Sequence, residues 1–158
     1  MGIMIDKNDI LRYSRQIILK EIGYEGQEKL LNSKVLVVGT GGLGSPALYY
    51  LAASGVGTLG IADFDLVGIS NLQRQSLHFT EDLGRKKVDS AGEKLKKVNP
   101  GVKIIKYPYR IDADNIEEIV QQYDVVVDAV DNFPARYLIS DCCYFKRKPL
   151  IEGAVLGF

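Results

Sequence analysis

The sequence lacks tryptophan, has a single histidine and two cysteines, and carries no formal net charge. Its 20 lysines and arginines balance 20 aspartates and glutamates, so no overall field would draw the chain to nucleic acid or an anionic membrane. No apolar run approaches the roughly 20 residues of a membrane-spanning helix, and the N-terminus lacks the basic and then apolar form of a signal peptide. We therefore expect a cytoplasmic protein with neither nucleic acid nor membrane as a partner.

The few cysteine and histidine residues also exclude several kinds of site. Cys142 and Cys143 are adjacent, and neighbours on a helix point in different directions, so we expect buried side chains rather than a disulfide framework. For the same reason we expect no zinc ligands in this chain. His78 has no cysteine or serine motif beside it, which favours a loop residue over a catalyst.

The chain is about one domain long. Its 158 residues can bury a sizeable core, and a second independent domain is not expected. Hydrophobic residues at 46% and charged residues at 25% are ordinary for a globular protein and argue against long disorder.

An apolar run from Val35 to Val38 breaks into a glycine cluster and then into a helix-like pattern. Four consecutive aliphatic residues suit a strand buried on both faces of a parallel sheet. Gly39, Gly41 and Gly44 fit the spacing G-x-G-x-x-G, which permits a tight turn, a close phosphate and close helix packing. Tight turns also recruit glycine for steric reasons alone, so the motif by itself leaves both interpretations open.

Apolar periodicity and helix-breaking residues predict alternating helices and strands. Helices are expected at residues 6–20, 24–31, 44–55, 85–98, 112–122 and 134–145, with Asp6 and Asp112 as N-caps and Gly23 ending the first. Strands are expected at residues 35–38, 57–62, 102–107, 124–129 and 149–152. This order predicts an α/β fold: a Rossmann-like, mostly parallel sheet flanked by helices and preceded by two N-terminal helices. Tyr49 and Tyr50 are expected to pack within their helix.

Two acidic residues are expected at the carboxyl ends of strands, where parallel sheets bind ligands. Asp63 lies about where a dinucleotide fold places the acid for a ribose hydroxyl, and Asp131 follows the strand at residues 124–129. Between them, the polar stretch at residues 66–83 is long enough to predict a functional loop. Lys86 and Lys87 open the next helix, where a bound anion would offset an unfavourable dipole; solvated lysines are the alternative.

Several further motifs follow one another in a fixed order. They are Arg12-Tyr13-Ser14-Arg15-Gln16, the Gly39 to Gly44 turn, Asp63-Phe64-Asp65, Asn71-Leu72-Gln73-Arg74-Gln75, Lys87 and Asp128-Ala129-Val130-Asp131-Asn132. In this combination the chain resembles the ThiF/MoeB/HesA family, whose members are relatives of the ubiquitin-activating enzymes. The resemblance covers essentially the whole chain, and ordered motifs are far more specific than one glycine loop.

The resemblance implies a homodimeric adenylyltransferase that depends on ATP and Mg²⁺. Its partner would be a ubiquitin-like sulfur carrier protein of thiamin or molybdopterin type pathways. The carboxylate of the carrier's C-terminal Gly-Gly would attack the α-phosphate of ATP, which gives an acyl-adenylate and pyrophosphate.

The resemblance also assigns residues. Nucleotide binding would fall to Gly39, Gly41, Gly42, Gly44, Asp63, Asp65, Asn71, Arg74, Gln75 and Lys87. Catalysis would fall to Arg15, Asn71, Arg74, Lys87 and Asp131, with Asp131 as the magnesium-binding acid and Arg15 inserted into the partner subunit's site. Structural alternatives are that Arg74 braces its loop, that Asp131 caps the next helix and that Asp65 turns the chain.

The chain departs from the family at its end, from Gly153 to Phe158. Family members ordinarily continue with more strands, usually a cysteine, and often paired C-x-x-C zinc ligands, none of which occurs here. We therefore expect residues 1–158 to form a single ATP-binding Rossmann-like domain, truncated at its C-terminal end. Two other functions stay open: an NAD-binding dehydrogenase or redox sensor, and a non-catalytic nucleotide- or carrier-binding module.

Overall fold

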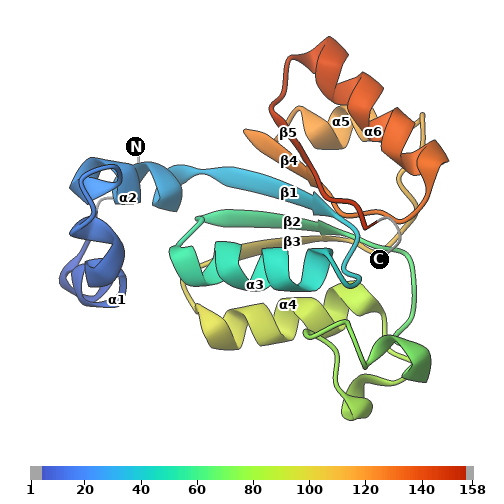
Figure 1. The fold of residues 1–158 in the computed structure, drawn as a ribbon, viewed down its shortest axis with the longest axis horizontal. Coiled ribbons are helices and arrows are strands. Elements are labelled where there is room, and N and C mark those ends of the chain that lie inside the picture. Colours follow the sequence, from blue (N-terminus) through green and yellow to red (C-terminus); the bar gives the residue numbers. More distant parts are fainter. Residues whose placement is uncertain (1–4, 156–158) are drawn as a thin grey trace.

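The computed structural model describes residues 5–155 and shows helices on both faces of one sheet (Figure 1). The helices are α1 (Lys7–Ile17), α2 (Gly23–Asn32), α3 (Gly44–Ser54), α4 (Lys87–Val98), α5 (Ile116–Val120) and α6 (Phe133–Lys146). The strands are β1 (Lys34–Val38), β2 (Thr58–Ala62), β3 (Lys103–Tyr107), β4 (Val125–Asp128) and β5 (Leu150–Glu152). Two 3-10 turns, Ile69–Asn71 and Thr80–Asp82, interrupt the loop between β2 and α4.

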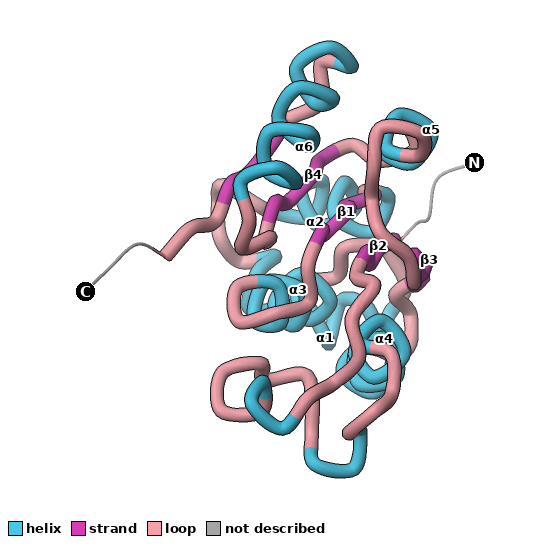
Figure 2. The backbone as a smooth tube through the Cα atoms, turned by 90° about the vertical axis from the view of Figure 1, so that its right-hand side faces the viewer, coloured by secondary structure: helices cyan, strands magenta, loops and turns pink. Residues whose placement is uncertain are grey.

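The five strands are all parallel, in the order β3-β2-β1-β4-β5. This confirms the predicted Rossmann-like α/β fold with two helices before the sheet. One core cluster joins the sheet to α3 and α4 through residues such as Leu48 and Val88, and the other joins it to α5 and α6 through Ile119 and Ile139. The chain changes from one face to the other between β1 and β4, and such switch points are where open α/β sheets bind ligands. Figure 2 views the sheet from the carboxyl ends of its strands.

The two N-terminal helices lie beyond the amino ends of the strands, at the left of Figure 1. A capping box of Asp6 and Asp9 starts α1, as expected from Asp6. The helix ends at Ile17, and Gly23, with a φ of +59°, begins α2 rather than ending α1. Tyr13 is buried and joins the core cluster of this end, whereas Leu11 and neighbouring apolar side chains remain exposed.

Three other local predictions are wrong. Helix α5 begins only at Ile116, because the Asp112 side chain accepts from the amide of Asp114 and forms a turn instead of a cap. Helix α4 begins at Lys87, two residues later than expected. Tyr49 and Tyr50 do not pack inside the protein but contact each other edge to face and are exposed.

Cys142 and Cys143 are both buried and unbridged on α6, as predicted. His78 lies in the loop between β2 and α4. Within residues 5–155, no helix has the length and apolar character needed to cross a membrane.

Candidate functional site

A cavity of about 1000 Å³ opens at the carboxyl ends of β1, β2 and β4. This volume is at the upper end of what small-molecule sites occupy. The predicted site residues in its lining are Gly39, Gly41, Gly42, Asp63, Asp65, Arg74, Gln75, Lys87 and Asp131. Segments far apart in sequence thus meet at the predicted edge of the sheet.

The four glycines of the β1–α3 turn form two pairs, and the reason why glycine is needed differs between the pairs. Gly39 has a φ of +96°, and a Cβ there would lie 2.7 Å from the Ala129 carbonyl oxygen. A Cβ on Gly44 would lie 1.8 Å from the Gly39 carbonyl oxygen. The fold alone therefore requires these two glycines, as expected for a tight turn and close helix packing.

Gly41 and Gly42 have no such steric cause. A Cβ at Gly41 would come no closer than 3.6 Å to Gln75 Nε2, and one at Gly42 no closer than 3.5 Å to Arg74 Cδ. These are ordinary van der Waals distances, and neither residue has a positive φ. Both line the cavity, where the missing side chains leave the loop backbone open to a ligand.

Asp63 orders this loop. One carboxylate oxygen, Oδ2, accepts from both the amide and the hydroxyl of Thr40, each at 2.8 Å. The other oxygen accepts from the Asp65 amide at 2.9 Å. Asp63 lines the cavity as predicted, and it also stabilises the glycine loop, which the spacing of the sequence did not indicate.

Lys87 and Asp65 form an ion pair at the cavity. Lys87 Nζ lies 2.8 Å from Asp65 Oδ2, and the Lys87 amide donates to the Asp65 carbonyl oxygen at 3.0 Å. The whole Lys87 residue is only 5% exposed, so the solvated-lysine alternative is wrong for Lys87 and holds for the exposed Lys86.

The loop before α4 contributes two more polar side chains to the cavity. Arg74 Nη1 donates to the Ser70 carbonyl at 3.0 Å, so it braces its loop and also faces the cavity beside Gly42. Gln75 is buried, and its Oε1 has no hydrogen-bond partner among residues 5–155. An unpaired buried acceptor is costly, so Gln75 fits a site that a ligand or water completes. Asn71 instead accepts from the Gly68 amide at 3.0 Å and does not line the cavity.

Asp131 is exposed at the cavity and does not cap α6. The cap is Asn132, whose side chain accepts from the Ala135 amide at 3.0 Å. Within residues 5–155 no three His, Cys, Asp or Glu side chains form a group that could hold a metal ion. A lone carboxylate is nevertheless a sufficient protein ligand for Mg²⁺ where substrate phosphates and water fill the remaining positions.

Arg15 is the predicted site residue that lies farthest from this edge. It is exposed on α1, beyond the amino ends of the strands (Figure 1), and it does not line the cavity.

Arg136, Arg110 and Phe64 also line the cavity, and the sequence did not indicate a site role for any of them. Arg136 Nη1 lies 3.2 Å from Asp128 Oδ2, and its Nη2 donates to the carbonyls of Val130 and Gly153, each at 2.8 Å. It therefore ties the ends of β4 and β5 together. On another wall, the Arg110 guanidinium lies 5.7 Å from the centre of the Phe64 ring. Arg136 could have been predicted from its place in the first turn of the helix that follows the Asp128 to Asn132 motif. No sequence pattern predicts the contact of Phe64 with Arg110.

Comparison with known proteins supports one family. The model of the ThiF family matches residues 13–158. The SAMP-activating enzyme E1 of Haloferax volcanii is 49% identical over 158 residues, which are 100% of this chain and 58% of that protein. The sulfur carrier protein adenylyltransferase of Thermus thermophilus is 49% identical over 152 residues, 96% of this chain and 56% of that protein. The chain thus spans little more than half the length of these relatives.

Solved structures show the same fold. The E. coli tRNA N6-threonylcarbamoyladenosine dehydratase TcdA, in complex with ATP, superposes with a TM-score of 0.89 at 24% identity. The match covers 95% of this chain and 61% of that one.

Proposed function

The chain belongs to the ThiF family, and on that premise we propose that it forms the ATP site of an adenylyltransferase acting on a ubiquitin-like sulfur carrier protein. The relatives that carry the family resemblance support this proposal, since the one from Thermus thermophilus is named for adenylating a sulfur carrier protein. Because the chain covers only part of those proteins, the activity is a proposal for the polypeptide that contains it.

One observation carries the proposal: at the same cavity the chain brings together an open glycine backbone, several cations that include Lys87 and Arg74, and the exposed carboxylate of Asp131. The amides of Gly41 and Gly42 suit phosphate oxygens, and Lys87 and Arg74 supply the positive charge that a triphosphate requires. Asp131 suits the Mg²⁺ that accompanies the phosphates. A nicotinamide dinucleotide binds without that metal, so Asp131 would have no purpose in a dehydrogenase.

The proposed reaction is an in-line displacement at phosphorus. A carboxylate oxygen of the carrier C-terminus attacks the α-phosphorus, and the bond to the oxygen that bridges to the β-phosphorus breaks. Pyrophosphate leaves with that electron pair, and the carrier is left as an acyl-adenylate. Lys87 and Arg74 neutralise charge on the phosphoryl oxygens, and Mg²⁺ held at Asp131 would contribute the same stabilisation.

We further propose that the site is completed in a homodimer by Arg15 of the second subunit. Arg15 lies at the end of the molecule opposite its own cavity (Figure 1), so it would act on a cavity only in another copy. An arginine supplied in this way would add charge that a single copy lacks.

The direct test has two stages. Calorimetry with ATP and Mg²⁺ should show binding to this chain, and NADH should bind more weakly. Exchange of labelled pyrophosphate into ATP should then depend on a carrier that ends in Gly-Gly, and a carrier extended beyond Gly-Gly is the matched control. Failure to bind ATP, or tighter binding of NADH, would contradict the proposal.

A further inference from the structure

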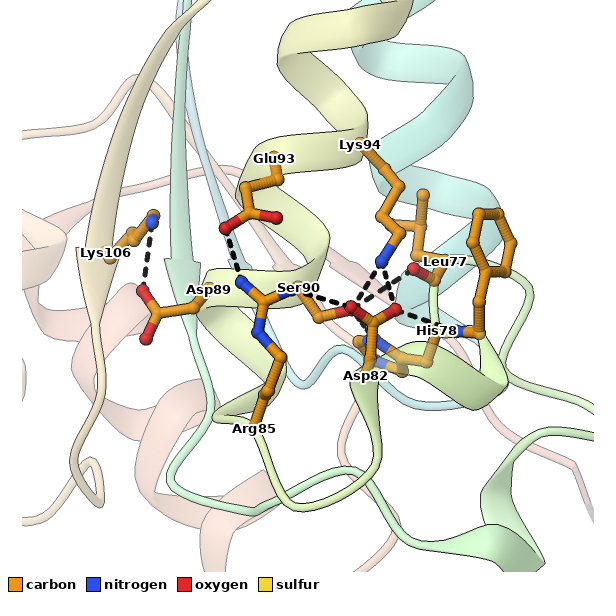
Figure 3. A network of polar contacts seen from close by, with 10 residues as sticks. Leu77, His78, Asp82, Arg85, Asp89, Ser90, Glu93, Lys94 and Lys106 are labelled. Atoms are coloured by element: carbon orange, nitrogen blue, oxygen red, sulfur yellow. Dashed lines mark hydrogen bonds and ion pairs between the residues drawn. The ribbon is translucent and has the colours of Figure 1, made fainter.

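A buried polar network connects the glycine loop to helix α4. Its visible part runs from Lys94 and Asp82 through Ser90 to His78 (Figure 3). From His78 it continues to the carbonyl oxygen of Thr40, which lies 3.1 Å from His78 Nε2. Sequence motifs did not indicate any of these contacts, and the proposed chemistry does not use them.

Thr40 is the residue through which the network reaches the cavity. It is fully buried, immediately before the open glycines Gly41 and Gly42. Asp63 holds its amide and hydroxyl, while Ser45 Oγ donates to its carbonyl at 2.9 Å. The His78 ring is the contact that joins this carbonyl to the α4 side of the cavity.

The direction of each hydrogen bond follows from the donors available. The Lys94 ammonium can only donate, so Ser90 Oγ accepts from it at 3.2 Å. The Thr40 carbonyl oxygen can only accept, so Nε2 of a neutral His78 ring must donate to it, and Nδ1 accepts the hydroxyl hydrogen of Ser90, 2.9 Å away. On this assignment Nε2 carries the ring hydrogen and donates to Thr40. Burial lowers the pKa of His78, which agrees with a neutral ring.

Helix α4 carries both Lys87, which faces the cavity, and Ser90, which contacts His78. Lys87 begins the helix, and Ser90 lies less than one turn further on. A fixed distance between the loop amides and the Lys87 cation is what a polyphosphate spanning them requires.

We propose that His78 is a positioning residue, which fixes the Thr40 carbonyl so that the Gly41 and Gly42 amides stay aligned with Lys87 for nucleotide phosphates. The part concerning phosphates rests on the proposed function. The part concerning the loop does not, because the contacts belong to the chain itself.

Two amide substitutions separate the two contacts of the ring. In His78→Gln the amide nitrogen reaches about as far as Nε2 and keeps the donor to Thr40. In His78→Asn the amide reaches only the position of Nδ1, so the contact with Ser90 is kept and that with Thr40 is lost. Tyr123→Phe is the control for a lost buried hydrogen bond, since Tyr123 pairs with Tyr107 at 2.9 Å and does not line the cavity.

Hydrogen exchange of the Thr40 amide in the nucleotide-free protein measures the stability of the loop directly, because this buried amide is protected by its hydrogen bond to Asp63. One buried hydrogen bond contributes about 1 kcal/mol, so His78→Asn should speed exchange about five- to tenfold and weaken ATP binding by a similar factor. His78→Gln keeps the contact with Thr40, so its exchange should stay within about threefold of wild type, but it loses the link to Ser90 on α4 and should weaken ATP binding about as much as His78→Asn. Tyr123→Phe should stay within about threefold of wild type in both measurements.

The outcomes are distinct. Unchanged exchange of the Thr40 amide in His78→Asn, equal exchange in His78→Asn and His78→Gln, or wild-type ATP affinity in His78→Gln would overturn the positioning role. A wild-type chain that fails to bind ATP would overturn the proposed function, and the exchange measurement would still decide the role of His78. A loss of melting temperature in His78→Asn without faster loop exchange would reduce the residue to a structural one.

Discussion

Lys87 Nζ lies 2.8 Å from Asp65 Oδ2, so the buried cation that faces the cavity already has an anionic partner within the chain. A phosphate that binds Lys87 must compete with this carboxylate. Asp65 therefore holds Lys87 in place when no ligand is bound. Removing the Asp65 charge should affect the stability of the protein and its ATP binding in opposite directions.

Asp65→Asn should lower the melting temperature, because it leaves a nearly buried ammonium without its counter-ion. ATP should then raise the melting temperature of the variant by more than that of wild type, since phosphate no longer displaces a carboxylate. Thermal shift with and without Mg·ATP measures both. A smaller ATP-induced shift in the variant would mean that Asp65 itself binds the nucleotide. Lys87→Ala is the matched variant, and it should lose ATP affinity by at least about tenfold.

The glycine turn provides a test that separates fold from ligand binding. Gly41→Ala and Gly42→Ala should fold with little change in stability, within about 1 kcal/mol, because each Cβ has room. Both should weaken ATP binding by about tenfold or more, since the methyl group occupies space in the cavity. Gly44→Ala should fail to fold, because its Cβ would overlap the Gly39 carbonyl. Wild-type ATP affinity in Gly41→Ala and Gly42→Ala would place the phosphates elsewhere.

These contrasts show what the sequence could and could not reveal. The spacing of Gly39 and Gly44 predicts the turn because its causes are local. The alternation of elements likewise predicts the parallel sheet, and Asp63 and Asp131 follow from the ends of its strands. The contact between Phe64 and Arg110 depends on two loops meeting in space, so no spacing predicts it.

Exposure was harder to predict than secondary structure. Tyr49 and Tyr50 have the apolar character of packed residues, yet they remain 43% and 70% exposed. Which face of α3 becomes buried depends on the sheet and α4, which are distant in sequence. Lys87 is the converse case, since its charged side chain is buried and paired with Asp65 of the loop before α4.

Asp131 offers a prediction for metal dependence. Asp131→Asn should leave the melting temperature unchanged, because Asn132 and not Asp131 caps α6. It should reduce Mg²⁺-dependent ATP–pyrophosphate exchange by about 100-fold or more, since a neutral amide binds Mg²⁺ weakly. Titration of Mg²⁺ should show a rightward shift for the variant. An exchange rate equal to wild type would refute the metal role, and the control Asn132→Ala should lose about 1 kcal/mol of stability.

The ion pair of Asp82 and Lys94 should make stability depend on pH (Figure 3). Burial acts to raise the pKa of Asp82, but the hydrogen bonds from Lys94 and the Phe79 amide outweigh it and lower the pKa from 3.8 to about 2. As the pH falls, the unfolded chain therefore binds this proton first, so the stabilisation is complete above about pH 4 and is lost toward pH 2. Asp82→Asn should cost about 3 kcal/mol at neutral pH.

Urea unfolding of wild type and Asp82→Asn at several pH values provides the measurement. The difference in unfolding free energy between the two proteins should shrink between about pH 4 and pH 2, because protonated Asp82 resembles asparagine. A difference that stays constant through this range would show that the pair does not hold the carboxylate ionised.

The proposed action of Arg15 across a dimer can be tested by mixing two inactive variants of the polypeptide that contains this chain. Arg74→Ala damages the cavity of its own copy, whereas Arg15→Ala would damage the cavity of the other copy. In a mixed dimer both lesions would then fall on one site and leave the other intact. With random mixing half the dimers are mixed, so about a quarter of the wild-type exchange activity should return. If Arg15 acts within its own copy, each site carries one lesion and the mixture stays inactive. Mixing either variant with itself is the control.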